Sequence, residues 1–315
     1  MPRPDITTGP GIPSGTPRVI FCGSTTLDTI FRVDALPEGP GKVLPHEMAV
    51  VAHGMAASAA AAAARLGSRS FLWSRLGADD TGRRICAELS AEGVDCSGVR
   101  RFDDKTSGLC TVLVDREGER LVVPFYDPSL PDEADWLPLD LVAGADAAMA
   151  DVRWPRGAEA LLDAACLAGI PAVLDADIGP RNVLLNLAGR ASHAVFSEPA
   201  ARIASGLPDV EAALEWLDFR LKGIVAITLG PKGCIWRDDG QVHRLPGHRI
   251  LAVDTLAAGD VFHGVLTWAL AQGVALDRGL VLANAAAAIK CQSFGGRRGA
   301  PDRAGIARFL EATCN

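Results

Sequence analysis

Short apolar segments of strand character alternate along this chain with segments long enough to form helices. They lie at residues 19–22, 147–150, 172–174, 194–196 and 224–228. Successive strands joined by helices run in the same direction, because each helix returns the chain to the start of the sheet. The alternation therefore predicts an α/β fold with a mostly parallel central sheet that is buried on both faces.

Polar residues follow several of these predicted strands. In open parallel sheets, binding sites lie beyond the carboxyl ends of the strands. The candidates at that edge are Asp28, Arg153, Asp175, Glu198 and Asp260. An aspartate in such a position is also a common turn residue, so the strand ends indicate a location more strongly than a role.

A β-hairpin is predicted early in the chain, outside this alternation. Residues 109–114 and 120–123 flank a turn that contains Gly118. A second extended pair is predicted at 30–33 and 43–51. These strands predict a small sheet separate from the central one.

The composition fits a compact enzyme rather than a disordered chain, with 49% hydrophobic and 22% charged residues among 315. The net charge of −7 gives no general attraction to nucleic acid or to an anionic membrane. Local donors must therefore bind any anionic substrate. The most apolar run, 55–64, is much shorter than the roughly 20 residues of a membrane span and predicts a helix that Gly67 ends.

Cysteine spacing and the N-terminus indicate the cellular compartment. The eight cysteines form no CxxC pair or histidine-spaced cluster, and we expect them to be reduced. Residues 1–17 are rich in Pro, Gly, Ser and Thr and lack the apolar core of a signal peptide. We expect a flexible leader and a cytoplasmic enzyme.

One segment, Asp254-Thr255-Leu256-Ala257-Ala258-Gly259-Asp260, has the local design of a phosphoryl-transfer site. It joins an extended segment at 250–253 to a helical one, and Ala257, Ala258 and Gly259 let backbone N–H groups approach an anion at the helix N-terminus. Asp260 can accept a proton from an attacking hydroxyl. Both Asp254 and Asp260 also have a simpler interpretation, as residues that cap the turn and the helix.

This segment and several others resemble the ribokinase-like (PfkB) carbohydrate kinases. Residues 254–264 resemble the C-terminal signature of that family. The other matching motifs, in order, are Gly23 with Asp28, Leu36-Pro37, Gly41-Lys42, Gly54-Met55-Ala56-Ala57-Ser58, Ala64-Arg65-Leu66-Gly67, Gly77-Ala78-Asp79-Asp80-Thr81-Gly82, Glu92-Gly93-Val94-Asp95 and Thr228-Leu229-Gly230-Pro231-Lys232-Gly233. The resemblance spans roughly residues 19 to 302.

The resemblance implies a ribokinase-like three-layer α/β/α sandwich with a mostly parallel central sheet and a small β-sheet lid. It divides the chain into a leader at 1–17 and a kinase domain at 18–310, with lid strands at about 30–51 and 107–126. It also implies an ATP-dependent kinase that uses Mg²⁺, and it leaves open a monovalent cation. In many relatives the lid is also a dimer contact, so we expect a homodimer through the lid.

Particular residues receive roles from the same resemblance. Asp260 becomes the general base, with the N–H groups of Ala257, Ala258, Gly259 and Asp260 holding the developing charge. The predicted sugar-binding residues are Asp28, Lys42, Gly54, Ser58, Arg153 and Asp260. The predicted nucleotide-binding residues are Thr228, Gly230, Gly233 and Asn284.

The chain departs from the family pattern in the sugar and metal regions. His53 stands where relatives carry the first glycine of a pair, and Ser58 stands where many have Asn. The Asn-x-x-Glu motif that organises Mg²⁺ reads Ser-Glu-Pro-Ala at 197–200. Glu198, or Asp177, could take over that task through water, because Mg²⁺ needs few direct protein ligands.

Within the family, segments at 150–154, 173–178, 196–199, 260–264 and 295–302 look like the sulfofructose kinase branch. The leading substrate is therefore 6-deoxy-6-sulfofructose, with Lys42 and Arg153 as cationic donors to the sulfonate. Pro124 opposes this assignment, because relatives that bind the sulfonate use an Asn there and proline has no donor. Fructose, 2-keto-3-deoxygluconate, ribose and a nucleoside remain alternative substrates.

Two other classes of protein compete with the kinase. A non-catalytic sugar- or nucleotide-binding module could keep the fold, although the intact Asp260 turn opposes this. A dinucleotide oxidoreductase is disfavoured because no G-x-G-x-x-G follows the first strand.

Overall fold

The computed structural model describes residues 11–238 and 240–313. Within them, a nine-stranded sheet has the order β13-β12-β11-β10-β9-β8-β1-β4-β5. Its strands are β1 (Arg18–Cys22), β4 (Arg69–Gly77), β5 (Val94–Phe102), β8 (Ala147–Asp151), β9 (Ala172–Ala176), β10 (His193–Ser197), β11 (Ile224–Thr228), β12 (Cys234–Asp238) and β13 (Gln241–Leu245). Neighbouring strands from β5 to β11 are parallel, and only β12 and β13 are antiparallel additions.

Helices cover both faces of this sheet and give three layers. On one face lie α1 (Met55–Arg65), α2 (Asp80–Ala91), α7 (Ala258–Leu270), α8 (Leu276–Lys290) and α9 (Arg303–Thr313). On the other lie α3 (Pro155–Ala168), α4 (Arg181–Ala188), α5 (Glu198–Ser205) and α6 (Val210–Arg220). Side chains of each strand point alternately into these two cores. The predicted three-layer α/β/α sandwich is confirmed.

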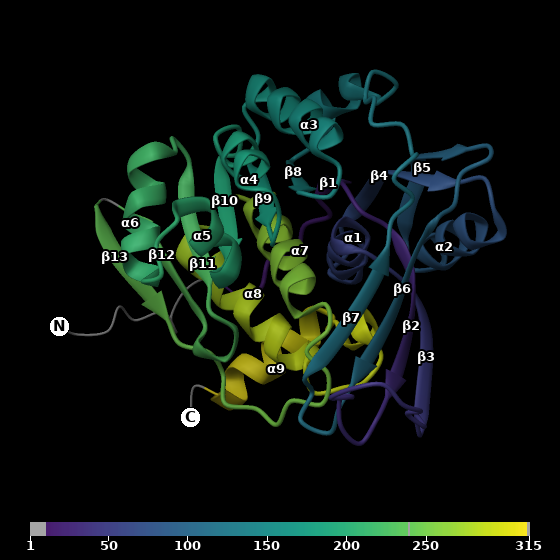
Figure 1. Ribbon diagram of the computed structural model, residues 1–315. Helices are drawn as coiled ribbons and strands as arrows, with labels where there is room; N and C mark the ends of the chain where they lie inside the picture. The colour runs from purple at the N-terminus through teal and green to yellow at the C-terminus, as the bar shows by residue number, and fades with distance from the viewer. Residues whose placement is uncertain (1–10, 239, 314–315) are drawn as a thin grey trace.

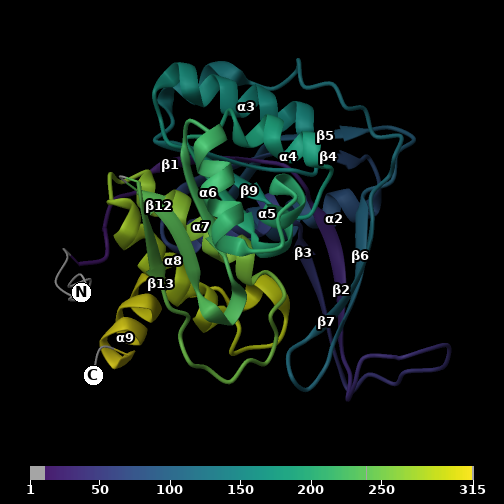
Figure 2. The ribbon, with the colours of Figure 1, turned by 60° about the vertical axis from the view of Figure 1, so that its left-hand side comes forward.

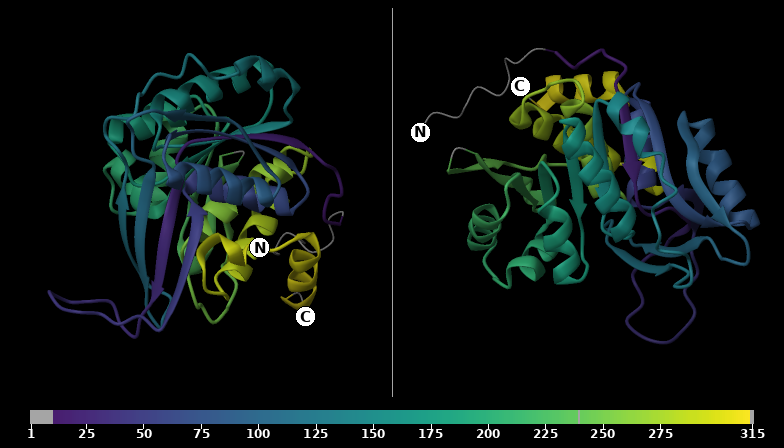
Figure 3. Two further views of the ribbon diagram at one scale, coloured as in Figure 1. Left: turned by 90° about the vertical axis from the view of Figure 1, so that its right-hand side faces the viewer. Right: turned by 90° about the horizontal axis from the view of Figure 1, so that it is seen from above.

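Four strands form the predicted lid beside the β1–β5 end of the main sheet (Figure 1). They are β2 (Thr26–Arg32), β3 (Glu47–His53), β6 (Gly108–Val114) and β7 (Arg120–Phe125), in the order β3-β2-β6-β7. The predicted hairpin is present, with Gly118 at a positive φ of 80° in its turn. The connection between β2 and β3 extends away from the body (Figures 2 and 3).

The two faces of the lid differ in what they contact. Ile30, Val51, Val112 and Val114 are buried on one face in a small core that includes Leu256, just before α7. This face closes over the carboxyl edge of the main sheet. The opposite face leaves large apolar side chains exposed.

The alanine-rich run forms α1, as predicted, and packs closely on α7. A Cβ at Gly264 would lie 2.4 Å from the carbonyl oxygen of Ala59, so only glycine allows this approach. Gly67 follows the helix at a positive φ of 82°. The small residues therefore place the N-terminus of α7 against the sheet.

Some elements differ from the sequence analysis. Strands β4, β5, β12 and β13 had not been predicted from periodicity; β5, for example, is an edge strand with many polar residues. The segment at 250–253 contains no regular strand, because its backbone pairs with the loop after α8 instead.

The structure also bears on the expectations for the cysteines, the N-terminal leader and membrane-spanning segments. Cys22, Cys86, Cys96, Cys110, Cys166, Cys234 and Cys291 are free thiols, and Cys314 lies outside the described residues. Residues 1–10 of the predicted leader also lie outside them. No helix in the described part of the chain has the length and apolarity needed to span a membrane.

Candidate active site

The N-terminus of α7 forms an open turn of small residues. Ala257, the residue before the helix, has a positive φ of 65°, a conformation that is unfavourable without glycine. Gly259 is exposed, and a Cβ built on it meets no atom within 4 Å. Among the described residues, the N–H groups of Gly259 and Asp260 have no acceptor. The helix thus presents free donors and its positive end to solvent, as an anion requires.

Asp260 lies in the first turn of α7 and is half-buried. Burial raises its pKa well above the usual range, and the charges of Asp175, Asp177 and Asp151 raise it further. Arg120 acts in the opposite direction. Because one nearby cation opposes several carboxylates, Asp260 is a stronger proton acceptor than an ordinary aspartate.

Asp254 holds the other end of the turn and is completely buried. Its Oδ1 accepts the N–H of Leu256 at 2.8 Å, and its Oδ2 accepts those of Gly295 and Gly296 at 3.0 and 2.8 Å. The Lys290 ammonium group donates a hydrogen bond to the Asp254 carbonyl oxygen. Asp254 is therefore more than a simple turn cap, because it ties the turn to the loop that follows α8.

The lid hairpin reaches the same turn. Arg120 Nη1 donates to Thr255 Oγ1 at 2.7 Å, and Thr255 Oγ1 donates to the Gly118 carbonyl at 2.7 Å. Neither Arg120 nor Thr255 was predicted as a site residue, although Arg120 begins a predicted hairpin strand and Thr255 lies within the predicted phosphoryl-transfer segment. The contact brings a cation from the lid toward Asp260.

A buried pair of polar residues lies on the lid side of the site. Thr26 donates to Asp28 Oδ1 at 2.6 Å, and His53 Nδ1 is 3.3 Å from Asp28 Oδ2. Burial raises the pKa of Asp28 to about 7 and lowers that of His53 to about 3. The Nε2 of His53 and the Oγ of Ser58 are buried without a partner among the described residues. These unsatisfied groups fit a polar ligand with several hydroxyls.

Asp151, at the end of β8, organises this region, although sequence reasoning gave it no role. Its buried carboxylate accepts N–H groups from Ser24, Ala56 and Arg153 at 2.7, 3.0 and 2.8 Å. It thereby joins the loop after β1 to the start of α1. Gly54, whose φ is 103°, lies between them, and a Cβ there would be 2.5 Å from the Ser24 carbonyl.

The predicted cations Lys42 and Arg153 are not brought together within one chain. Lys42 is exposed in the connection between β2 and β3, which leaves the end of β2 opposite to Asp28 (Figure 2). Arg153 donates to Asp177 at 3.0 Å and to the Ile178 carbonyl at 2.7 Å. Arg75, which was not predicted, instead joins Arg153 in lining a small cavity beside Ser24, Tyr126 and Trp154.

The predicted nucleotide residues cluster at the end of β11 and near α8. Gly230 has a positive φ of 56° with open space around it. Gly233 is needed for packing, because a Cβ there would be 2.0 Å from the Leu245 carbonyl. Thr228 donates to the Phe196 carbonyl at 3.3 Å, and Asn284 to the Pro246 carbonyl at 2.9 Å. Gly230 and Gly259 therefore offer the open backbone that a phosphorylated ligand needs.

Carboxylates for a metal lie at the ends of β9 and β10. Asp177 contacts Arg153 and accepts from Ser197 at 3.2 Å, while Glu198 accepts from Arg202 at 2.6 Å. Within residues 11–238 and 240–313, no three His, Cys, Asp or Glu side chains are grouped as direct metal ligands. Half-buried carboxylates of this kind fit Mg²⁺ that keeps its waters and phosphate ligands.

His263 was also missed by the sequence analysis. It lies one turn after Gly259, with Nδ1 2.7 Å from the Gly259 carbonyl and 3.3 Å from Asp175 Oδ2. The ring thus lies between the turn and the buried carboxylate of β9, whose Oδ2 has no hydrogen-bond partner among the described residues.

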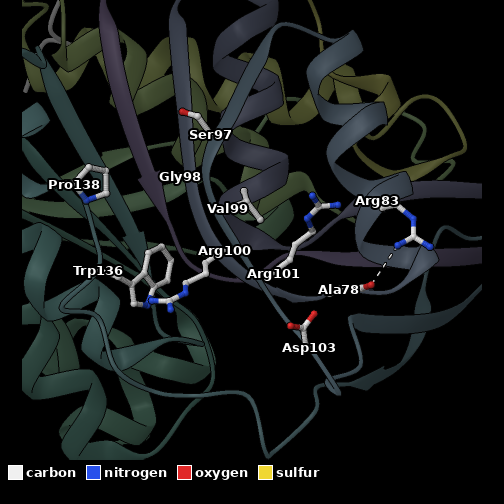
Figure 4. A pocket seen from close by; sticks show the side chains of 10 residues that line it. All are labelled: Ala78, Arg83, Ser97, Gly98, Val99, Arg100, Arg101, Asp103, Trp136 and Pro138. Carbon is white, nitrogen blue, oxygen red and sulfur yellow. Dashed lines mark hydrogen bonds between the residues drawn. The ribbon is translucent and has the colours of Figure 1, made fainter.

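A cavity of about 910 Å³ lies against the edge strand β5 of the main sheet (Figure 4). Arg83, Arg100, Arg101 and Trp136 line it. None of the residues gathered around Asp260 or Asp28 lines it. Volume alone therefore does not locate the site, and the chemistry at the carboxyl ends of the strands does.

Comparison with known proteins finds similar chains over nearly the whole of this sequence. A family model described as pfkB family carbohydrate kinase matches residues 16–303. The chain is 28% identical to a ribokinase of Haemophilus influenzae over 92% of this chain and 97% of that protein. It is 31% identical to an ATP-dependent ribose-1-phosphate kinase of Halopiger xanaduensis, with coverages of 93% and 98%.

A solved structure is also closely similar. A provisionally assigned ribokinase from Agrobacterium tumefaciens superimposes with a TM-score of 0.92 at 44% identity, covering 95% of this chain and 99% of that one. The similarity includes both the main sheet and the lid, because nearly the whole of each chain is matched.

Proposed function

The chain belongs to the pfkB family of carbohydrate kinases and is an ATP-dependent enzyme of that class; from this premise we propose that it phosphorylates a primary hydroxyl of a monosaccharide with Asp260 as general base. The observation that carries this role is the junction at α7, where Asp260 has a raised pKa beside N–H groups that no described residue uses. Such a junction combines a proton acceptor with an anion site.

ATP bound with Mg²⁺ supplies the transferable phosphoryl group. Phosphoryl transfer needs positioning and charge neutralisation more than covalent help. We assign proton removal to Asp260 and stabilisation of the departing oxygens to the N–H groups of Ala257, Gly259 and Asp260. The Ala258 N–H, which was predicted for the same role, already donates to the Thr255 carbonyl at 3.3 Å. Arg120 would add a positive charge from the lid.

We assign nucleotide and metal binding to residues at the carboxyl ends of β9, β10 and β11. Thr228 and Gly230 would border the nucleotide, with Gly233 and Asn284 shaping that region through their packing and hydrogen bonds. Glu198 and Asp177 would hold Mg²⁺ through water, in keeping with its preference for oxygen ligands.

For the sugar, we assign hydroxyl recognition to Asp28, with Gly54 and Ser58 shaping the pocket. The leading substrate class is a sugar with a fixed anion, and 6-deoxy-6-sulfofructose is its first candidate. Arg75 and Arg153 support this choice, because both residues line one small cavity near Ser24 and bring positive charge to it. The relative named for ribose-1-phosphate also acts on an anionic sugar.

A neutral sugar such as ribose or fructose is the second candidate. Arg153 already pairs with Asp177. Pro124 is paired with Cys110, which is paired with Asp28, so it shares the lid face that carries Asp28 but offers no donor. The relative named ribokinase supports this alternative.

An ATP-consumption assay with Mg²⁺ tests these proposals with sulfofructose, ribose 1-phosphate, fructose, ribose, 2-keto-3-deoxygluconate and adenosine. We expect the highest kcat/KM for an anionic sugar. Arg153→Ala should raise KM about 10-fold or more for that sugar and much less for a neutral one. Arg190→Ala, which removes a surface ion pair with Asp163, is the control.

Equal effects of Arg153→Ala on both kinds of sugar would reject the anionic class. No turnover of any sugar, with intact nucleotide binding, would instead support a non-catalytic binding module.

We also propose a homodimer through the exposed face of the lid. Met48, Leu109, Leu121, Val123 and Phe125 are each at least 41% exposed there. Their register places them on the face opposite to Asp28. A contiguous apolar face of this kind is typical of a protein interface.

A further inference from the structure

Lys290, the last residue of α8, is completely buried. Lysine is almost never fully buried unless it is paired, because an ammonium group loses its hydration there. Its Nζ donates to the Asp254 carbonyl oxygen and lies 3.5 Å from Asp254 Oδ1. Both contacts are to one residue at the start of the anion-binding turn, so this cation has a definite partner.

The surrounding hydrogen bonds connect Lys290 to the turn. The N–H groups of Val253 and Asp254 donate to the Cys291 carbonyl at 2.7 and 3.2 Å. The Asp254 carboxylate accepts the N–H of Leu256, immediately before Ala257. A change in the position or charge of Asp254 would therefore move the donors of the turn.

The positive charge of Lys290 also affects the turn, because it balances the negative charge of Asp254. Burial lowers the pKa of Lys290, while the charge of Asp254 raises it. Without the ammonium group, Asp254 would be a buried carboxylate with no cation in direct contact among residues 11–238 and 240–313. A negative charge at that place would oppose phosphate binding a few residues away.

We propose that Lys290 is a positioning residue, a built-in cation that neutralises Asp254 and fixes the turn at 256–259, so that this kinase needs no monovalent cation from solution to support the turn. The inference rests on the proposed role of the turn in holding phosphate. The family resemblance left open a monovalent cation. In this chain the Lys290 ammonium group already supplies the positive charge beside Asp254, so no cation from solution is required there.

The test compares Lys290→Ala, which leaves space for a small cation, with Lys290→Met, which fills the space without charge. The exposed Lys222→Ala is the control. MgATP affinity is measured by calorimetry without sugar, and turnover is measured with the best sugar of the panel. Potassium, ammonium and tetramethylammonium chloride are compared at equal ionic strength, and melting temperatures are recorded.

We expect wild-type turnover to vary less than about 2-fold among these salts. Both Lys290 variants should lose about 10-fold or more in kcat or MgATP affinity, because one partner of a buried ion pair is removed. Ammonium or potassium should restore Lys290→Ala, and tetramethylammonium should not. Lys290→Met should not respond to any of the three.

Several outcomes would overturn the proposal. One is a rise of more than about 5-fold in wild-type turnover when potassium is added. This result would overturn the proposal even if the variants fail to fold, because it would show that the wild-type enzyme requires a cation from solution. Full activity of Lys290→Met, or a folded Lys290→Ala that no small cation restores, would also do so. A wild-type protein that binds MgATP but phosphorylates no sugar would refute the proposed function, while the affinity measurements would still test Lys290.

Discussion

Asp260 has an electrostatic setting that its own position in the helix does not create. Its pKa is raised by burial and by carboxylates from β9, the segment after β9, and β8. An acidic residue in the first turn of an isolated helix would instead be stabilised as the anion. The difference explains why we propose this aspartate as a base, whereas the same residue type at other helix starts is a cap.

We predict that Asp260→Asn lowers kcat about 10²–10⁴-fold, because the amide cannot accept the proton. MgATP affinity should be retained or improved, since a negative charge is removed near the phosphates. Steady-state kinetics and calorimetry measure the two effects. Asp277→Asn, in the first turn of α8, is the matched control. Near-normal turnover of Asp260→Asn would remove Asp260 from the base role.

The pKa of Asp28 predicts a pH-dependent affinity for sugar. Burial raises that pKa to about 7, so acidification below this value protonates the carboxylate in the free enzyme. The protonated group accepts fewer hydrogen bonds from hydroxyls. His53, with a pKa of about 3, stays neutral throughout this range and does not offset the change.

We therefore expect KM for the sugar to rise as the pH falls below about 7, approaching 10-fold per pH unit. Asp28→Asn should have a high KM with little pH dependence. KM and kcat measured between about pH 5.5 and 8.5 check this expectation. The same pH dependence in Asp28→Asn and wild type would assign the titration to another group.

At the scale of elements, the lid hairpin and the α7 turn are joined by one threonine. Thr255 Oγ1 both accepts from Arg120 and donates to the Gly118 carbonyl. Residues 118–120 and 255 are far apart in sequence, so this junction depends on how β6 and β7 cross the site. The contact makes the lid hairpin a direct neighbour of the turn that we propose binds phosphate.

Thr255→Val keeps the side-chain shape and removes both of these bonds. We expect kcat/KM to fall about 5- to 30-fold, as for the loss of one or two kcal/mol of positioning. Hydrogen exchange at 115–120 should be faster, because the hairpin tip is released. Thr313→Val removes a similar hydroxyl contact at the end of α9 and is the control. Unchanged exchange at the hairpin would contradict the junction.

At the scale of the whole molecule, the proposed dimer interface would link the sugar site to assembly through the lid. One face of the lid carries Asp28, and the other carries the apolar patch defined by Met48, Leu109, Leu121, Val123 and Phe125. Packing on the outer face would therefore stabilise the lid strands that support the sugar pocket.

We predict that Val123→Asp converts a dimer into a monomer, because it buries a charge in the interface. KM for the sugar should rise several-fold through loss of support for the lid. Light scattering coupled to size-exclusion chromatography gives the mass. Leu167→Asp changes a side chain that is 90% exposed on α3 and should leave the mass unchanged. A monomeric wild-type protein at assay concentration would refute the lid interface.

The sequence by itself determined the parallel sheet, the lid hairpin and the small-residue turn before α7. Each depends on patterns between neighbouring residues: apolar runs, a glycine turn and side chains too small to obstruct backbone N–H groups. The same local patterns indicated Asp28 and Asp260 as candidates. The resemblance to the sulfofructose kinase branch also suggested pairing Lys42 with Arg153, which the tertiary structure places apart.

Only the tertiary structure decided what surrounds those candidates. Asp151 joins the loop after β1 to α1, Arg120 reaches Thr255 from the lid, and Lys290 neutralises Asp254 from the end of α8. These partners are separated by tens of residues, so no local pattern reveals them. Burial and distant charges, which exist only after the elements pack, set the pKa values and the geometry on which the chemistry depends.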